Sequence, residues 1–157
     1  MRMLMVIMLV GGCGPSAKDV ERARASTYSC KPQQVFEAMV EELKERRLPI
    51  AQVDTDEGMV VSEYRWHTAD GTPKQKGAAV VGQGDVAIAI VAVLKRSGDN
   101  WRVVAEPDVL SHVVGSPRGQ RLARSDADWP VWADSKVDVY SVGLYERLKS
   151  CAVQPKI

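Results

Sequence analysis

The sequence predicts a two-layer α+β domain in which two helices cover one face of an antiparallel sheet. Two segments, one near each end of the chain, repeat apolar residues at spacings of three and four. Between them lie apolar segments that alternate along the chain and are separated by short polar turns. The 157 residues, 45% hydrophobic and 26% charged, suffice for one domain with a core and not comfortably for two. We therefore expect strand, helix, several antiparallel strands and helix, in that order.

The first amphipathic helix is predicted over residues 32–47. Pro32 suits the first turn of a helix, and Pro49 prevents the helix from continuing. The apolar face is expected to comprise Val35, Phe36, Met39, Val40 and Leu43, and the solvent face Glu37, Glu41, Glu42, Lys44, Glu45, Arg46 and Arg47. Residues 19–27, just before it, are charged and are either a frayed helix or an edge strand, of which we favour the strand.

The middle of the chain predicts a hairpin followed by a central strand pair. Residues 50–53 and 59–66 are expected to pair around the turn-forming segment 54–58. Residues 85–95 are apolar on both faces, which indicates a central strand, and the small Ala87 and Ala89 would let a helix approach closely. Residues 101–106 are its partner. Residues 107–128 form a long, weakly patterned stretch that either extends the sheet or packs as a loop, and the last helix is expected to begin near Pro130.

The first thirteen residues have the order of a secretory signal. Arg2 precedes an apolar run from Met3 to Val10, and two glycines and Cys13 follow at once. The run is too short for a membrane-spanning helix, which needs about twenty residues. A buried strand is the alternative, but it would not explain the cation before the run or the Gly-Gly-Cys after it.

The segment Val10-Gly11-Gly12-Cys13 resembles the lipobox of bacterial lipoproteins. The resemblance implies cleavage before Cys13 and acylation of that cysteine, which would anchor the protein to a membrane. The expected organisation is a signal peptide over residues 1–12, a lipidated tether over 13–19 and a single α+β domain over 20–157. By resemblance to lipoprotein sorting patterns, Gly14 in place of an aspartate implies the outer membrane, facing the periplasm.

A second, weaker resemblance covers about a quarter of the chain. The run Val35-Phe36-Glu-Ala-Met39 through Val53-Asp54, followed by Gly58-Met-Val-Val-Ser62-Glu, resembles the helix-then-hairpin opening of small envelope lipoprotein domains. Such domains occur in the lipoprotein component of the outer-membrane β-barrel assembly machinery. The resemblance implies a helix-on-sheet fold and supplies no catalytic residues.

The cysteine count agrees with export. If Cys13 is acylated, Cys30 and Cys151 remain, the first just before the first predicted helix and the second at the end of the last. Disulfides form and persist in exported domains, so we expect these two to be bridged. The alternative is two unrelated buried thiols.

Few residues suggest chemistry. The formal charge of +1 and the sparse aromatic residues argue against nucleic acid as a partner. His67 and His112 lack partners at metal-ligand spacing, and Ser111 beside His112 lacks a nucleophile elbow, so we expect no metal, cofactor or catalytic residue.

Trp129 and Trp132 either pack the last helix against the core or form an interaction patch beside residues 107–128. The function we expect is that of a non-enzymatic, lipid-anchored envelope protein that binds another envelope protein or supports assembly. The alternative is a small enzyme, or a carrier of an apolar ligand, with a pocket between sheet and helices.

Overall fold

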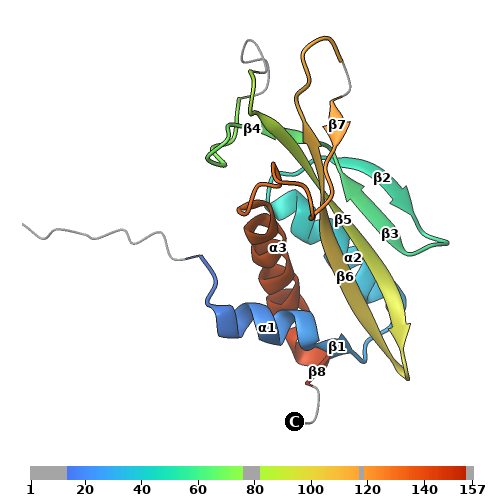
Figure 1. The fold of residues 1–157 in the computed structure, drawn as a ribbon. Coiled ribbons are helices and arrows are strands. Elements are labelled where there is room, and N and C mark those ends of the chain that lie inside the picture. The colour runs from blue at the N-terminus through green and yellow to red at the C-terminus, as the bar shows by residue number, and fades with distance from the viewer. Residues whose placement is uncertain (1–13, 76–81, 117–118, 155–157) are drawn as a thin grey trace, which may run out of the picture.

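The fold is an antiparallel sheet with helices on one face (Figure 1). It is seen in a computed structural model that describes residues 14–75, 82–116 and 119–154. The helices are α1 (Ala17–Ala25), α2 (Pro32–Glu45) and α3 (Ala133–Leu148), which continues into the short 3-10 turn η1 (Lys149–Cys151). The strands are β1 (Thr27–Tyr28), β2 (Ile50–Asp54), β3 (Met59–Ser62), β4 (Arg65–His67), β5 (Val86–Ser97), β6 (Asn100–Ser111), β7 (Gln120–Arg121) and β8 (Ala152–Val153). The predicted two-layer α+β class is confirmed.

The sheet is built around the long hairpin of β5 and β6. Its strand order is β2-β3-β5-β6-β1-β8, with β4 also paired to β5 and β7 to β6. β6 runs past the predicted end at residue 106, through Pro107 opposite Ile90, to Ser111 opposite Val86. Residues 107–128 are predicted either to extend the sheet or to pack as a loop, and residues 107–111 extend the sheet. On the side of β6 away from β5, β1 pairs at Trp101 and β7 pairs at Leu110 and Ser111. Pro107 lies between these two pairings, on a free edge of β6, and proline, which has no N–H to donate, is tolerated there.

The helix α2 confirms the predicted amphipathic segment, with one correction. Val35, Met39 and Leu43 are fully buried, as expected. Glu42, which was expected on the solvent face, is only 2% exposed. Its carboxylate is paired with Arg46 Nε at 2.8 Å and with Arg147 Nε of α3 at 2.6 Å. The helix thus buries a charge between α2 and α3, which is tolerated because both oxygens have guanidinium partners.

The helix α1 overturns the expected strand over residues 19–27. Ser16 caps it by accepting a hydrogen bond from the Asp19 backbone N–H, and Arg22 and Arg24 lie in its last turn, where cations are favourable. It packs against α3, and Arg24 pairs with Asp138 at 2.6 Å. Only Thr27 and Tyr28 form a strand. The helix also takes in residues 17–19 of the expected tether.

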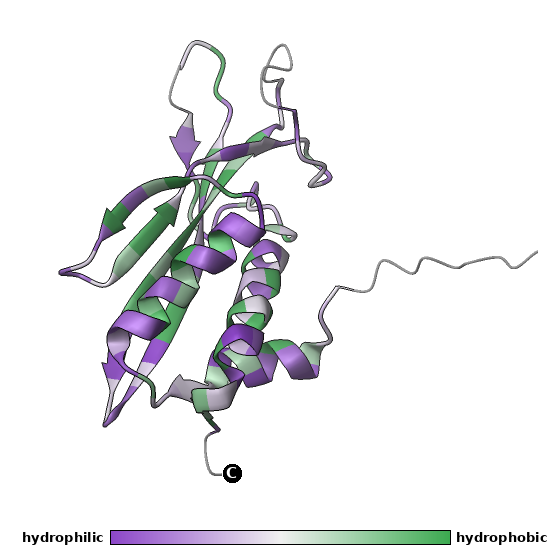
Figure 2. Cartoon of the chain, turned by 180° about the vertical axis from the view of Figure 1, so that it is seen from behind, coloured by the Kyte–Doolittle hydropathy of each residue, from purple (hydrophilic) through white to green (hydrophobic). Residues whose placement is uncertain are grey.

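The main core lies between the sheet and the helices α2 and α3. Tyr140 and Leu144 of α3 meet Val35 and Met39 of α2 over Ile90 and its neighbours in the sheet. Figure 2 shows the two helices lying across the sheet. Because side chains alternate along β5, Ile88 and Ile90 face the helices, and Ala87 and Ala89 face away. The expected approach of a helix to the alanine face is therefore wrong, since larger side chains fill the layer between sheet and helices.

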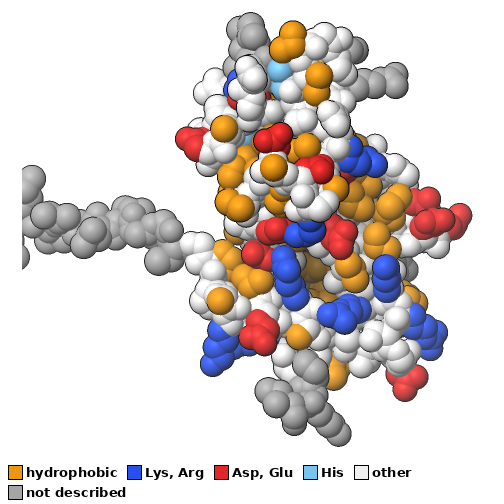
Figure 3. Space-filling view, in the orientation of Figure 1, with side chains coloured by type: hydrophobic (Ala, Val, Ile, Leu, Met, Phe, Trp, Pro, Cys, Tyr) orange, Lys and Arg blue, Asp and Glu red, His pale blue; other side chains and the backbone are white. Residues whose placement is uncertain are grey.

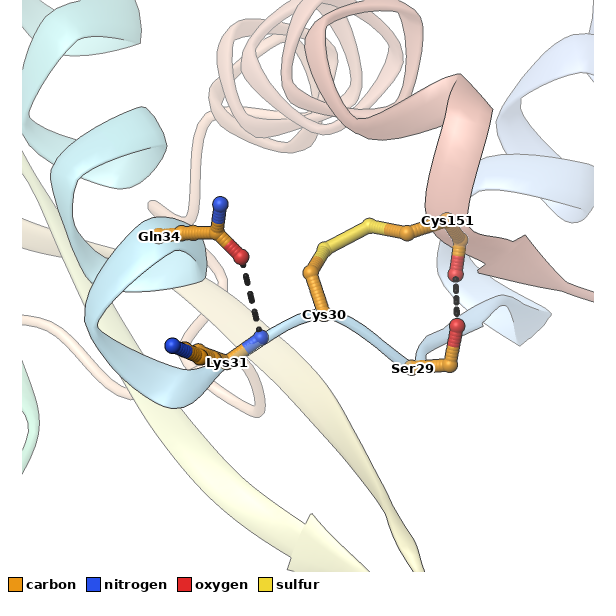
Figure 4. Close-up of a disulfide and its surroundings, with 5 residues drawn as sticks. All are labelled: Ser29, Cys30, Lys31, Gln34 and Cys151. Carbon is orange, nitrogen blue, oxygen red and sulfur yellow. Dashed lines mark hydrogen bonds between the residues drawn. A yellow bond between two sulfur atoms is a disulfide. The ribbon is translucent and has the colours of Figure 1, made fainter.

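A disulfide joins Cys30 and Cys151, as predicted, with the two Cα atoms 5.6 Å apart (Figure 4). Beside it, the backbone N–H and the hydroxyl of Ser29 both donate to the Cys151 carbonyl, at 2.9 and 3.2 Å. The strand β8, which follows Cys151, pairs with β1 through Tyr28 and Ala152. The segments around β1 and β8 are therefore fixed together at one corner of the domain.

Candidate functional site

The face of the sheet away from the helices carries a groove of about 720 Å³. Its floor is apolar and crosses β3, β5 and β6, with Met59 opposite Val93, Val61 opposite Val91, and Val93 opposite Val104. Hydrophobic side chains are visible on the right of Figure 3, where Figure 1 places β3 and β5. We call this surface the sheet groove.

One end of the sheet groove is closed by a polar cluster. Asp108 Oδ2 accepts hydrogen bonds from the Tyr64 hydroxyl at 2.5 Å and from Arg121 Nη2 at 2.6 Å. Partial burial and the neighbouring Asp108 raise the pKa of Tyr64, so the phenol stays protonated and donates. The residues come from segments far apart in sequence and together hold β7 at the margin of the groove.

Opposite charges mark the two ends of the groove. Lys95 lies opposite Arg102, and Glu106 lies opposite Val91. Lys95 and Glu106 are thus about 14 Å apart along the strand direction, from four residues at about 3.4 Å each. Both side chains are exposed.

A second hollow, of about 240 Å³, lies between the sheet and the helices where α2 ends and α3 begins. Its walls are apolar and include Leu48, Ile88, Ile90 and Val139. Three cationic side chains also line it: Arg46, Arg65 and Lys136. We call it the helix-end cavity; Figure 1 shows the end of α2, the start of α3 and β4 converging there.

His67 lines the helix-end cavity and is 5% exposed. Its Nδ1 lies 2.8 Å from the Arg65 carbonyl, which assigns the proton to that nitrogen. Burial, together with the charge of Lys136, lowers the pKa of His67 to about 4, so the ring is neutral at neutral pH. The Trp132 ring packs on it with the ring centroids 5.1 Å apart.

The two tryptophans singled out in the sequence are half-buried and pack against a small core cluster formed by Val86, Ile88, Val109 and Ala133. Trp132 Nε1 donates to the Ala69 carbonyl at 2.9 Å, and Arg124 lies over the Trp129 ring. These contacts agree with core packing, and the interaction patch at Trp129 and Trp132 stays a prediction.

Cys13 and the signal segment lie outside the described residues.

The weaker candidates are not assembled into a reactive site. Ser111 donates to the Gln120 carbonyl at 3.3 Å, whereas His112 packs edge-on against Trp66. Asp54 accepts from the backbone N–H groups of Asp56 and Glu57 and so shapes the β2–β3 turn. In residues 14–75, 82–116 and 119–154, no three His, Cys, Asp or Glu side chains gather as metal ligands would. Within the same ranges, no helix has the length and apolar character to cross a bilayer.

The sequence predicts a pocket between sheet and helices only as an alternative and identifies no residue that lines it. It does not predict the sheet groove. The cations of the helix-end cavity come from the C-cap of α2, from β4 and from α3, and only the tertiary fold brings them together. The one local signal is Arg65-Trp66-His67, since alternate residues of a strand share a face.

No protein-family model matches this chain, and neither does any curated protein.

Proposed function

We propose that this chain is a lipid-anchored, non-enzymatic envelope protein that binds another envelope protein through the sheet groove. The observation that carries the proposal is the apolar floor of Met59, Val61, Val91, Val93 and Val104 on a sheet face that α2 and α3 leave open. Contiguous apolar surface of this kind is typical of interaction sites.

The charges at the ends of the groove specify the partner's chemistry. An extended segment about five residues long would span the distance from Lys95 to Glu106. The complementary segment carries an acidic residue at the Lys95 end, apolar residues between, and a basic residue at the Glu106 end. The Tyr64–Asp108–Arg121 cluster closes the groove beyond that point.

The lipobox-like segment supports the cellular setting of the proposal. An acylated Cys13 would be the membrane attachment and would place the sheet groove beside other proteins of the cell envelope. The outer membrane, facing the periplasm, is the proposed location.

The test is photo-cross-linking in intact cells, with the photoreactive residue at Val93 in the groove or at the exposed Glu37 of α2 as the matched control. We expect Val93 to give an adduct with a single envelope protein, and Glu37 to give none. Val91→Asp, checked for folding by circular dichroism, should abolish the adduct by placing a charge on the apolar floor. Cys13→Ser should remove acyl labelling, release the protein from membranes and lower the adduct yield.

Two outcomes would contradict the proposal. An adduct of twice the mass of this chain would assign the groove to self-association. Equal adducts from Val93 and Glu37 would show that the groove has no special role.

A further inference from the structure

We infer that the helix-end cavity binds a small organic carboxylate whose body is apolar. This site is separate from the sheet groove, because the cavity lies on the helix side of the sheet and the groove on the other side.

The charge of the cavity favours an anion. No carboxylate lines it, while Arg46, Arg65 and Lys136 do. Arg46 is already paired with Glu42. In the part of the chain that the structure describes, neither Arg65 nor Lys136 forms an ion pair, and Lys136 Nζ lies 5.8 Å from the centre of the Trp132 ring. Two cations are therefore available to a carboxylate.

The walls and the volume of the cavity define the rest of the ligand. Leu48, Ile88, Ile90 and Val139 offer apolar contacts that a simple inorganic anion would not use. A hollow of about 240 Å³ has room for a small organic molecule and is smaller than the pockets that hold drug-sized ligands. A fully apolar ligand of that size would leave the cations without solvent or a counterion, which is costly.

The His67 ring forms a fixed part of the cavity wall. The side chain is buried, and its Nδ1 donates to the Arg65 carbonyl at 2.8 Å. The Trp132 ring packs on its face, with the ring centroids 5.1 Å apart. The ring therefore adds a wall of set orientation beside Arg65 and Lys136.

The test is calorimetric titration of the full chain in micelles of a non-ionic detergent, with hexanoate as the probe and neutral hexanamide as its matched control. We expect hexanoate to bind in the millimolar range that about eight heavy atoms support. Hexanamide and inorganic phosphate should each bind about tenfold more weakly, because one lacks the charge and the other the apolar body.

Variants locate the site. Arg65→Gln and Lys136→Gln should each weaken hexanoate binding about fivefold or more, as loss of a charge-assisted hydrogen bond does. Lys149→Gln, which removes a surface cation paired with Glu146, should leave it unchanged. Hexanoate should shift the amide NMR signals of Ile88 and Ile90 more than those of Val91 and Val93.

Any of three results would overturn the inference. In the first, hexanoate fails to bind at concentrations up to tens of millimolar, and in the second, hexanoate and hexanamide bind with equal affinity. In the third result, Lys149→Gln weakens hexanoate binding as much as Arg65→Gln and Lys136→Gln do. Phosphate binding as tightly as hexanoate would overturn the apolar part of it. Because the sheet groove is not involved, none of these results bears on the proposed function.

Discussion

Gly143 lies on α3 where that helix meets the buried carboxylate of Glu42. A Cβ atom built on Gly143 would overlap the Glu42 side chain and lie 2.6 Å from Arg46 Nη2. The carboxylate cannot easily move aside, because Arg46 and Arg147 hold both of its oxygens. Glycine is therefore required by space at this position, although alanine is the better helix former.

We predict that Gly143→Ala lowers the free energy of unfolding by about 1–3 kcal/mol, the usual cost of overpacking, despite its gain in helix propensity. Urea unfolding followed by circular dichroism measures this. Ser141→Ala, in the same helix, is the matched control and should change stability little. In the background of Glu42→Ala, the Gly143→Ala substitution should cost less, since the overlapping group is gone. A stabilised single variant would contradict the close contact.

His67 predicts a pH dependence of stability. Its pKa is lowered to about 4 in the folded protein, chiefly by burial and then by Lys136, from about 6.5 in the unfolded chain. Between these values the unfolded state binds more protons, so stability should decline as the pH falls from 6.5 to 4. The urea midpoint of His67→Asn should decline less over this range, while that of His112→Asn should follow the parent protein. Parallel curves for the parent and His67→Asn would contradict the prediction.

Among the elements, α2 and β5 could be predicted because each carries a strong local pattern. Residues 32–45 repeat apolar side chains at helical spacing after a proline, and residues 86–97 begin with an unbroken apolar run. The helix α1 could not be recognised from an apolar face, because only Ala23 of its nine residues is buried. The local signals for α1 are the Ser16 cap and the order of its charges, with Asp19 in the first turn and Arg22 and Arg24 in the last. These signals favour the helix over the predicted edge strand.

The candidate sites escaped prediction for a different physical reason. The burial of Glu42 depends on Arg147, which is 105 residues away, and no helical periodicity can report a partner at that distance. In the same way, Arg46, Arg65 and Lys136 each look like an ordinary solvated cation in sequence. Their convergence follows from strand pairing and helix packing together, which are properties of the tertiary fold.

At the scale of the whole molecule, the disulfide holds the beginning of the domain to its end. It links residues 121 positions apart, and in the chain-entropy model a loop of that order is worth roughly 4–5 kcal/mol. We predict that the double variant Cys30→Ser/Cys151→Ser loses about 4 kcal/mol of stability in urea unfolding. Cys13→Ser should lose none. Unchanged urea midpoints in the double variant would show that packing alone holds this corner.

The position of α1 limits how far the domain can stand from a membrane. Only Gly14, Pro15 and Ser16 separate Cys13 from the helix, so a fully extended connection reaches about 14 Å. An anchor at Cys13 would therefore hold the α1 end of the domain close to the lipid surface. A partner that meets the sheet groove would then itself be at or near the membrane.

The junction of β1, β8 and the disulfide also affects the order in which parts of the fold can form. Thr27 and Tyr28 gain their β8 neighbour only when Ala152 and Val153 are present, and Cys30 gains its bridge only with Cys151. The β5–β6 hairpin, by contrast, is local and can form as soon as residues 86–111 have emerged. In a chain that leaves a ribosome or a translocation channel from its N-terminus, β1 can pair with β6 first, and its other edge stays unpaired until β8 arrives. Completion of the fold is thereby coupled to the arrival of Cys151 and of Ala152 and Val153, and a chain cut short before Cys151 keeps an unpaired edge on β1 and a free thiol at Cys30.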